Sequence, residues 1–158
     1  MIRLIVVVTV TVLLNATPGG SVEPGAAKPS SKDKCPVCGM FVAKYPDWVA
    51  GAVFRDNTRH YFDGPKDLFK FLLDLKQYAP GKRQTDIDTV FVTDYYAVRP
   101  IDGRTAFYVQ GSDVNGPMGR ELVPFENAAE AREFLKDHRA MRVFRFNEIT
   151  PAVLKELD

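Results

Sequence analysis

The feature that most constrains the fold is a strand–strand–helix–strand order that the sequence presents twice. In the first copy, β-branched and aromatic residues predict strands at 47–54 and 58–62, joined by a tight hairpin loop. Residues 63–78 then change to helical periodicity, and Asp63 is placed to cap the start of this helix. A further strand, or two short strands joined at an aspartate, is predicted at 89–98.

The second copy follows the same order with shorter segments. Strands are predicted at 105–111 and 121–125, on either side of a glycine-rich loop at 112–120. A helix is predicted at 127–138, with a capping-box sequence at its start, and a strand at 141–149 completes the copy. A short C-terminal helix follows.

One copy alone is too small to bury a complete hydrophobic core, so the two copies are expected to pack together. Their order predicts an α+β fold, in which two related ββαβ units form antiparallel sheet with helices packed on one face. We expect the folded domain to cover 35–158, with its halves at about 35–98 and 99–150.

Composition narrows the class of protein. The chain has 158 residues, of which 46% are apolar and 26% are charged, as in an ordinary soluble globular protein. Its 21 basic and 20 acidic residues give a net charge of +1, and the basic residues are scattered along the chain. A nucleic-acid partner is therefore not expected.

The N-terminus has the pattern of a segment that directs export. A single cation, Arg3, precedes an apolar run from Leu4 to Leu14, which is shorter than the roughly 20 residues that span a bilayer. We interpret residues 1–27 as a signal peptide or retained N-terminal anchor, and residues 28–34 as a flexible tether. The folded domain is then expected in the periplasm or on the outer face of the cell envelope.

Both cysteines of the chain lie in the segment CPVCGM (35–40). One interpretation is an envelope thiol–disulfide oxidoreductase that uses Cys35 and Cys38, although no helix is predicted to start at Cys38 to lower a thiol pKa. A second is a closed zinc site completed by His60 and His138, although their spacing matches no zinc-finger pattern. A third is an inert disulfide bridge in a structural domain.

A site for a soft metal ion is the fourth interpretation. Thiolate and thioether ligands select Cu(I) over harder ions. Met40 follows Cys38 by two positions, so in an extended segment both side chains would lie on one face. Met118, in the predicted loop NGPMGR, has no apolar neighbours there and could close a three-ligand shell, whereas Met141 begins a predicted strand and is expected in the core. Glycine beside Met40 and Met118 would let the backbone turn sharply.

The two histidines have ordinary structural explanations as well as functional ones. His60 lies in a predicted strand, and His138 lies at a predicted helix end, where the helix dipole favours its charged form. Either could add a ligand to a metal site or exchange a proton as the metal enters.

Several blocks of the sequence, in this order and spacing, form a specific set. They are CPVCGMFVAKYPDW, YFDGPKDLFKF, DYY, GPMGRELVPF and FLKDH…VFRFNEI. Together they resemble the NosL family of nitrous oxide reductase accessory proteins, over a region from about Cys35 to about Thr150. The lipid-modified cysteine at the end of the signal in many members is not visible here.

The resemblance implies a Cu(I)-binding metallochaperone of the cell envelope rather than an enzyme. Its implied partner is nitrous oxide reductase, whose copper–sulfide centre would receive the copper, or the membrane machinery that matures this reductase for denitrification. The family's ligands fall on Cys38, Met40 and Met118, and His138 is the best-placed histidine. Cys35 is an additional ligand, a disulfide partner or a bystander.

Overall fold

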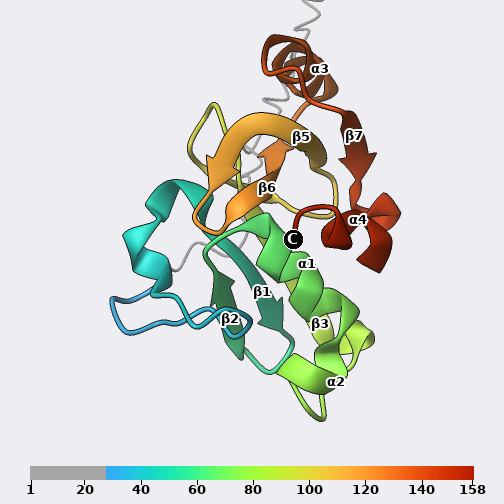
Figure 1. Cartoon of the computed structure of the whole chain (residues 1–158). Coiled ribbons are helices and arrows are strands. Elements are labelled where there is room, and N and C mark those ends of the chain that lie inside the picture. The colour runs from blue at the N-terminus through green and yellow to red at the C-terminus, as the bar shows by residue number, and fades with distance from the viewer. Residues whose placement is uncertain (1–27) are drawn as a thin grey trace, which may run out of the picture.

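The computed structural model describes residues 28–158 (Figure 1). The predicted signal peptide or anchor at 1–27 lies outside the described residues. Within residues 28–158, none of the helices has the length and apolar character needed to cross a membrane.

The first half of the chain forms a four-stranded antiparallel sheet in the order β2-β1-β3-β4. The strands span Ala50–Phe54 (β1), Arg59–Phe62 (β2), Ile87–Thr93 (β3) and Pro100–Asp102 (β4). Short 3₁₀ turns at Val42–Lys44 and Pro46–Trp48 precede β1, and another at Gln84–Asp86 precedes β3. The strand predicted from residue 47 therefore begins three residues later, after the second of these turns.

The second half forms a three-stranded antiparallel sheet in the order β6-β5-β7. Its elements are β5 (Phe107–Gly116), β6 (Gly119–Phe125), α3 (Ala128–Asp137), β7 (Arg142–Arg145), a 3₁₀ turn (Phe146–Glu148) and α4 (Pro151–Lys155). The predicted α+β class is confirmed, with two antiparallel sheets rather than a single one.

The glycine-rich segment 112–120 is not the loop that its composition predicts. Most of it extends β5 and β6 into a polar hairpin arm, with a register shift between Gln110 and Asn115. Gly119 has φ +85°, so it turns the chain at the tip of the hairpin, directly after Met118. The segment is polar because the arm is largely exposed, not because it is irregular.

The strand predicted at 89–98 also ends early, at Thr93. The Asp94 carboxylate accepts hydrogen bonds from the backbone N–H groups of Tyr96 and Ala97, which folds residues 95–97 into a turn. Its other oxygen accepts from the N–H of Glu126, at 2.7 Å. A side chain that bonds the local backbone in this way stops a strand from continuing.

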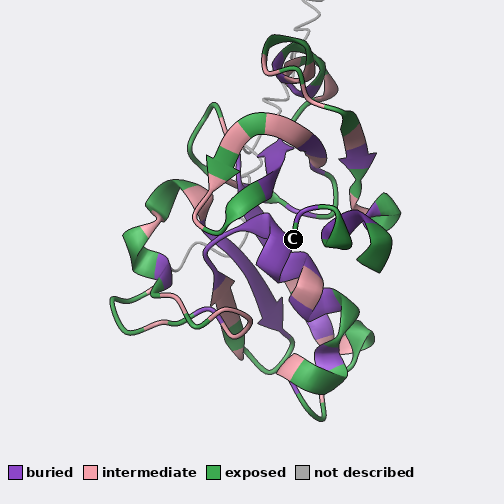
Figure 2. Cartoon of the chain, in the orientation of Figure 1, coloured by how far each residue is buried: buried purple, intermediate pink, exposed green. Residues whose placement is uncertain are grey.

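The single helix predicted at 63–78 is two helices. They are α1 (Pro65–Leu73) and α2 (Leu75–Tyr78). The break falls at Asp74, whose carboxylate accepts from the N–H of Gln77 and thereby caps α2. Helix α1 is buried along most of its surface (Figure 2). It packs against β1 and β2 of its own half and against β6 and α4 of the other.

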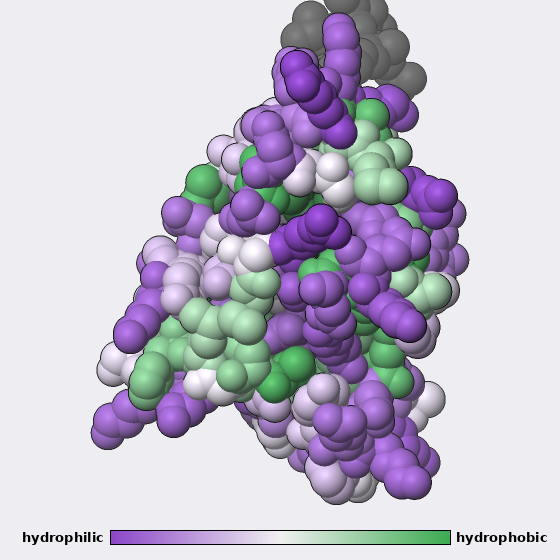
Figure 3. All heavy atoms as spheres, viewed as in Figure 1, coloured by the Kyte–Doolittle hydropathy of each residue, from purple (hydrophilic) through white to green (hydrophobic). Residues whose placement is uncertain are grey.

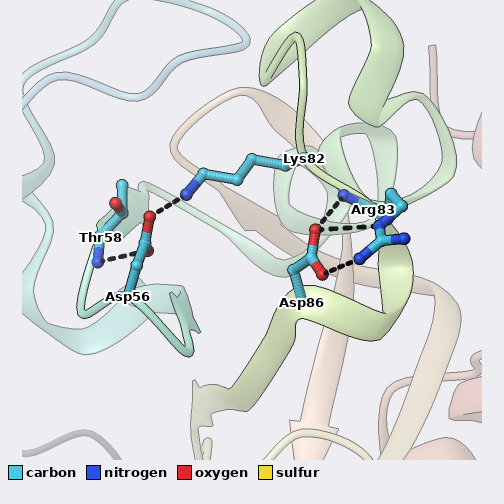
Figure 4. A network of polar contacts seen from close by, with 5 residues as sticks. All are labelled: Asp56, Thr58, Lys82, Arg83 and Asp86. Carbon is cyan, nitrogen blue, oxygen red and sulfur yellow. Dashed lines mark hydrogen bonds and ion pairs between the residues drawn. The ribbon is translucent and has the colours of Figure 1, made fainter.

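Charged residues connect the loops at the α2 end of the first half (Figure 4). The Asp56 carboxylate accepts from the Lys82 ammonium group and from the N–H of Thr58, and Asp86 pairs with Arg83. The hydrogen bond from Lys82 lowers the pKa of Asp56 to about 2. Exposed pairs of this kind contribute little to stability individually, so the fold depends on its core.

Candidate metal centre

The backbone of residues 35–40 forms a tight turn that brings both cysteines to one place. The N–H of Gly39 donates to the carbonyl of Cys35 at 2.9 Å, and the N–H of Cys35 donates to the carbonyl of Met40 at 2.8 Å. Gly39 has φ +79°, the left-handed conformation that glycine adopts at little cost. The sharp turn predicted at this glycine is therefore present. Directly before and after the turn, Lys34 and Phe41 form an antiparallel bridge.

This turn corrects one detail of the sequence analysis. Since Gly39 is left-handed, the segment from Cys38 to Met40 is not extended, and the argument that both side chains lie on one strand face does not apply. Residue 34, expected within the flexible tether, is paired with residue 41 by the same turn.

Each thiol faces a buried carboxylate from the region where α1 begins. The Cys35 thiol donates to Asp67 Oδ2 at 3.3 Å, and the Cys38 thiol donates to Asp63 Oδ1 at 3.2 Å. Asp63 lies just before α1 and Asp67 lies in its first turn, four residues later, so both carboxylates lie on the same side of the helix start. The four side chains offer ligand atoms that all lie within 4.8 Å of one another.

The predicted capping role of Asp63 is wrong, because its carboxylate bonds a thiol instead. The cap comes from Glu121 in the other half of the chain, whose Oε1 accepts from the N–H of Lys66 in the first turn of α1 at 2.6 Å. Glu121 also accepts from the N–H of Leu122. This approach needs Gly64, since a Cβ there would lie 2.2 Å from Glu121 Oε2.

The surroundings keep both thiols protonated. Burial, reinforced by the neighbouring carboxylates, raises the pKa of the Cys35 thiol far above its ordinary value. The same causes raise the pKa of the Cys38 thiol to about 12. Cys38 is half-buried whereas Cys35 is fully buried, so Cys38 is the thiol that an arriving metal ion reaches first.

The predicted thioether ligands lie on two different segments. Met40 is half-buried at the end of the cysteine turn. Met118 lies at the tip of the β5–β6 hairpin with 47% of its surface exposed. The Lys66 ammonium group donates to the Met118 carbonyl at 3.3 Å, so this tip is attached to the same turn of α1 that carries Asp67.

The remaining candidate residues lie elsewhere. His138 Nδ1 lies 2.7 Å from Asp113 Oδ1, and its ring stacks on Phe134. His60 lies against aromatic rings in β2 and on α1, and its burial lowers its pKa. Neither histidine belongs to the cluster of thiols and carboxylates, so the closed Cys₂His₂ zinc site considered from the sequence does not form.

Met141, expected in the core, is 74% exposed. It precedes β7, which is shorter than predicted and covers only Arg142–Arg145. Its side chain packs against Gly111, where an added Cβ would lie 2.5 Å from Met141 Cγ. Met118 and Met141 are thus both exposed methionines of the second half, and only Met118 is attached to α1.

Apolar side chains gather on the surface over the cysteine turn, at the lower left of Figure 3, where Figure 1 shows the N-terminal segment in blue. Phe41, directly after the turn, is also among the exposed large apolar residues. This turn therefore presents an apolar surface beside its thiols.

Sequence reasoning missed Asp67 and Glu121, and assigned Asp63 to another role. One signal was available: YFDGPKDLF places two carboxylates four residues apart at the start of a helix that is otherwise apolar. A carboxylate in such a position needs a partner once the helix is buried. The spacing alone does not say that the partners are thiols.

Comparisons with known proteins bear on this site. The sequence model of the NosL family matches residues 26–154. The chain is 30% identical over 142 residues to a protein of Stutzerimonas stutzeri described as "Copper-binding lipoprotein NosL", covering 86% of this chain and 70% of that protein. It is similar to the crystal structure of the copper chaperone NosL from Shewanella denitrificans, with a TM-score of 0.68 and 27% identity, over 82% of this chain and 98% of that one.

Proposed function

The chain belongs to the NosL family, and on this premise we propose that it binds one Cu(I) ion in the cell envelope and delivers it for assembly of nitrous oxide reductase. The proposed ligands are the Cys38 thiolate and the thioethers of Met40 and Met118. Copper is here a cargo, taken up and passed on.

One observation carries this proposal. A partly accessible thiol in a tight turn lies beside the start of α1, and the same helix turn holds the exposed hairpin tip of Met118 through Lys66. Sulfur ligands from two distant segments thus come toward one region of the surface. Thiolate and thioether are the ligands that favour Cu(I).

The proposed ligands contribute differently. The Cys38 thiolate would supply most of the affinity, and it must release its proton because metals bind the deprotonated form. The thioethers would add selectivity for a soft ion without adding charge. Cys35 is a further candidate ligand. His138 would first have to leave Asp113, with which it is paired.

Release of copper would proceed by ligand exchange. The exposed Met118 can be displaced by a ligand of the recipient while Cys38 still holds the ion, so the ion is never without sulfur ligands. The proposed recipient is nitrous oxide reductase or its membrane maturation machinery. The apolar surface around the cysteine turn is a suitable place for the recipient to dock.

The alternative function, a thiol–disulfide oxidoreductase, has little support. The nucleophile in thiol–disulfide exchange is the thiolate, and both thiols have raised pKa values. Cys38 also does not begin an α-helix; the chain enters a 3₁₀ turn at Val42. Membership of the NosL family agrees with the expectation that the chain is not an enzyme.

Competition with a Cu(I) chelator in the absence of oxygen tests the ligands. We expect the reduced chain to bind one equivalent of Cu(I), and Cys38→Ser to weaken binding by orders of magnitude. Met118→Ala should weaken it by a smaller factor. Met141→Ala is the matched control, because it removes an exposed methionine of the same half and should leave affinity unchanged. Equal affinities of the two methionine variants would remove Met118 from the site.

Delivery needs a separate measurement. In cells that produce only the Cys38→Ser variant, nitrous oxide reductase should accumulate with less copper than in cells with the unchanged protein. Normal copper content in the reductase would refute delivery while leaving Cu(I) binding intact. An envelope location is proposed because the relative from Stutzerimonas stutzeri is described as a lipoprotein, and cell fractionation tests it.

A further inference from the structure

The proposed Cu(I) ligands leave Asp63 and Asp67 without a function. Carboxylates are hard ligands that add little to the binding of a soft ion. Both are nonetheless buried, with Asp63 only 1% exposed. Asp63 Oδ2 is the one buried side-chain oxygen or nitrogen among the described residues that lacks a hydrogen-bond partner. A buried, unpartnered carboxylate oxygen is costly unless something pairs with it.

We propose that Cys35, Cys38, Asp63 and Asp67 form a four-ligand site for a divalent cation of borderline softness, for which Zn²⁺ is the best match. Two thiolates and two carboxylates form a mixed set that Zn²⁺ accepts, and four protein ligands make a closed site. The unpartnered oxygen of Asp63 would gain its partner in the ion. This inference does not depend on the proposed binding of Cu(I).

The distances suit such an ion. Zinc bonds of about 2.3 Å to sulfur and about 2.1 Å to oxygen, at tetrahedral angles, hold a sulfur and an oxygen about 3.6 Å apart. The two thiol–carboxylate pairs here are separated by 3.3 Å and 3.2 Å. A shift of a few tenths of an ångström in each pair, about the size of a side-chain adjustment, would therefore admit the ion.

The supporting structure holds the ligands in place. Asp67 lies in the first turn of α1, which Glu121 caps from the other half. The positive end of the helix dipole at this turn offsets part of the negative charge of two thiolates and two carboxylates. The two cysteines are fixed by the backbone hydrogen bonds of their turn.

Because Cys38 belongs to this ligand set and to the proposed Cu(I) set, the two ions would exclude each other. The carboxylates distinguish them: replacing an aspartate by asparagine should weaken Zn²⁺ binding and leave Cu(I) binding nearly unchanged. An asparagine side chain still accepts a hydrogen bond from the thiol through its amide oxygen, so the packing of the turn is preserved.

Titration of the full chain, reduced and metal-free, with Zn²⁺ against a zinc chelator tests the site. We expect one equivalent to bind, and Asp63→Asn and Asp67→Asn each to weaken binding at least tenfold, since even the loss of an outer partner of a metal ligand costs about 10–100-fold. Asp113→Asn, which changes an exposed carboxylate paired with His138, is the matched control and should have no effect.

Co²⁺ provides a measurement that needs no variant. Bound to the unchanged chain, it should give the intense visible bands of a four-coordinate ion and charge-transfer absorption from sulfur. Weak six-coordinate bands, or Zn²⁺ affinities equal among the three asparagine variants and the unchanged chain, would overturn the proposal. Absence of Zn²⁺ binding with Cu(I) binding retained would overturn this inference alone, whereas the reverse result would overturn only the proposed function.

Discussion

The two principal helices begin in equivalent places, each directly after the second strand of a hairpin, but their first turns differ. At the start of α3, Asn127 accepts hydrogen bonds from the N–H groups of Ala129 and Glu130, so the helix caps itself in an exposed position. At the start of α1 the nearby carboxylates face thiols, and the cap comes from Glu121.

The difference shows how a buried polar site can be built at the end of a helix. The backbone N–H groups of a first turn need acceptors, and a side chain that bonds a thiol cannot supply them in full. Glu121, which lies 55 residues from Lys66 along the chain, takes over that role. Asp63 is then available for Cys38, and the candidate metal centre depends on a contact between the two halves.

Removal of the long-range cap should have the largest effect. In Glu121→Ala two buried N–H groups lose their acceptor, so we expect the free energy of unfolding to fall by about 3 kcal/mol. The matched change at the other helix, Asn127→Ala, should cost only about 1 kcal/mol, because water can replace an exposed cap. Urea denaturation followed by circular dichroism compares them, and equal losses would show that the two helix starts do not differ as described.

Gly64→Ala tests the close approach that the cap needs. The added Cβ would lie 2.2 Å from Glu121 Oε2, so we expect a loss of about 2 kcal/mol from overpacking. The same substitution in a Glu121→Ala background should cost much less, because the colliding carboxylate is gone. A cost that is the same in both backgrounds would assign the effect of Gly64→Ala to another cause.

A pH dependence of stability should be the smallest effect. Complete burial raises the pKa of Glu121 to about 8 from an ordinary value of 4.5. Between these values the folded state binds more protons than the unfolded state, so stability should fall as pH rises through this window, by up to about 1.4 kcal/mol per pH unit. Glu121→Gln should flatten this slope, as measured by urea denaturation across the window. An unchanged slope would mean that another group titrates.

Local features of the sequence predicted local features of the structure well. Alternation gave the hairpin of β1 and β2, and the spacing of Asn127 gave the cap of α3. The glycines beside Met40 and Met118 are left-handed, as expected of residues that turn the chain sharply. Composition misled at 112–120, because polar residues predict a loop and an exposed hairpin arm equally well.

The sequence by itself determined the α+β class, the pairing of both thiols in one turn and the family. Each of these depends on residue types within a few positions of one another. The tertiary structure decided that Asp63 and Asp67 face the thiols, that Glu121 caps α1, and that Met141 is exposed. These depend on contacts between distant segments, and periodicity states only which face of an element is buried, not which side chain it meets there.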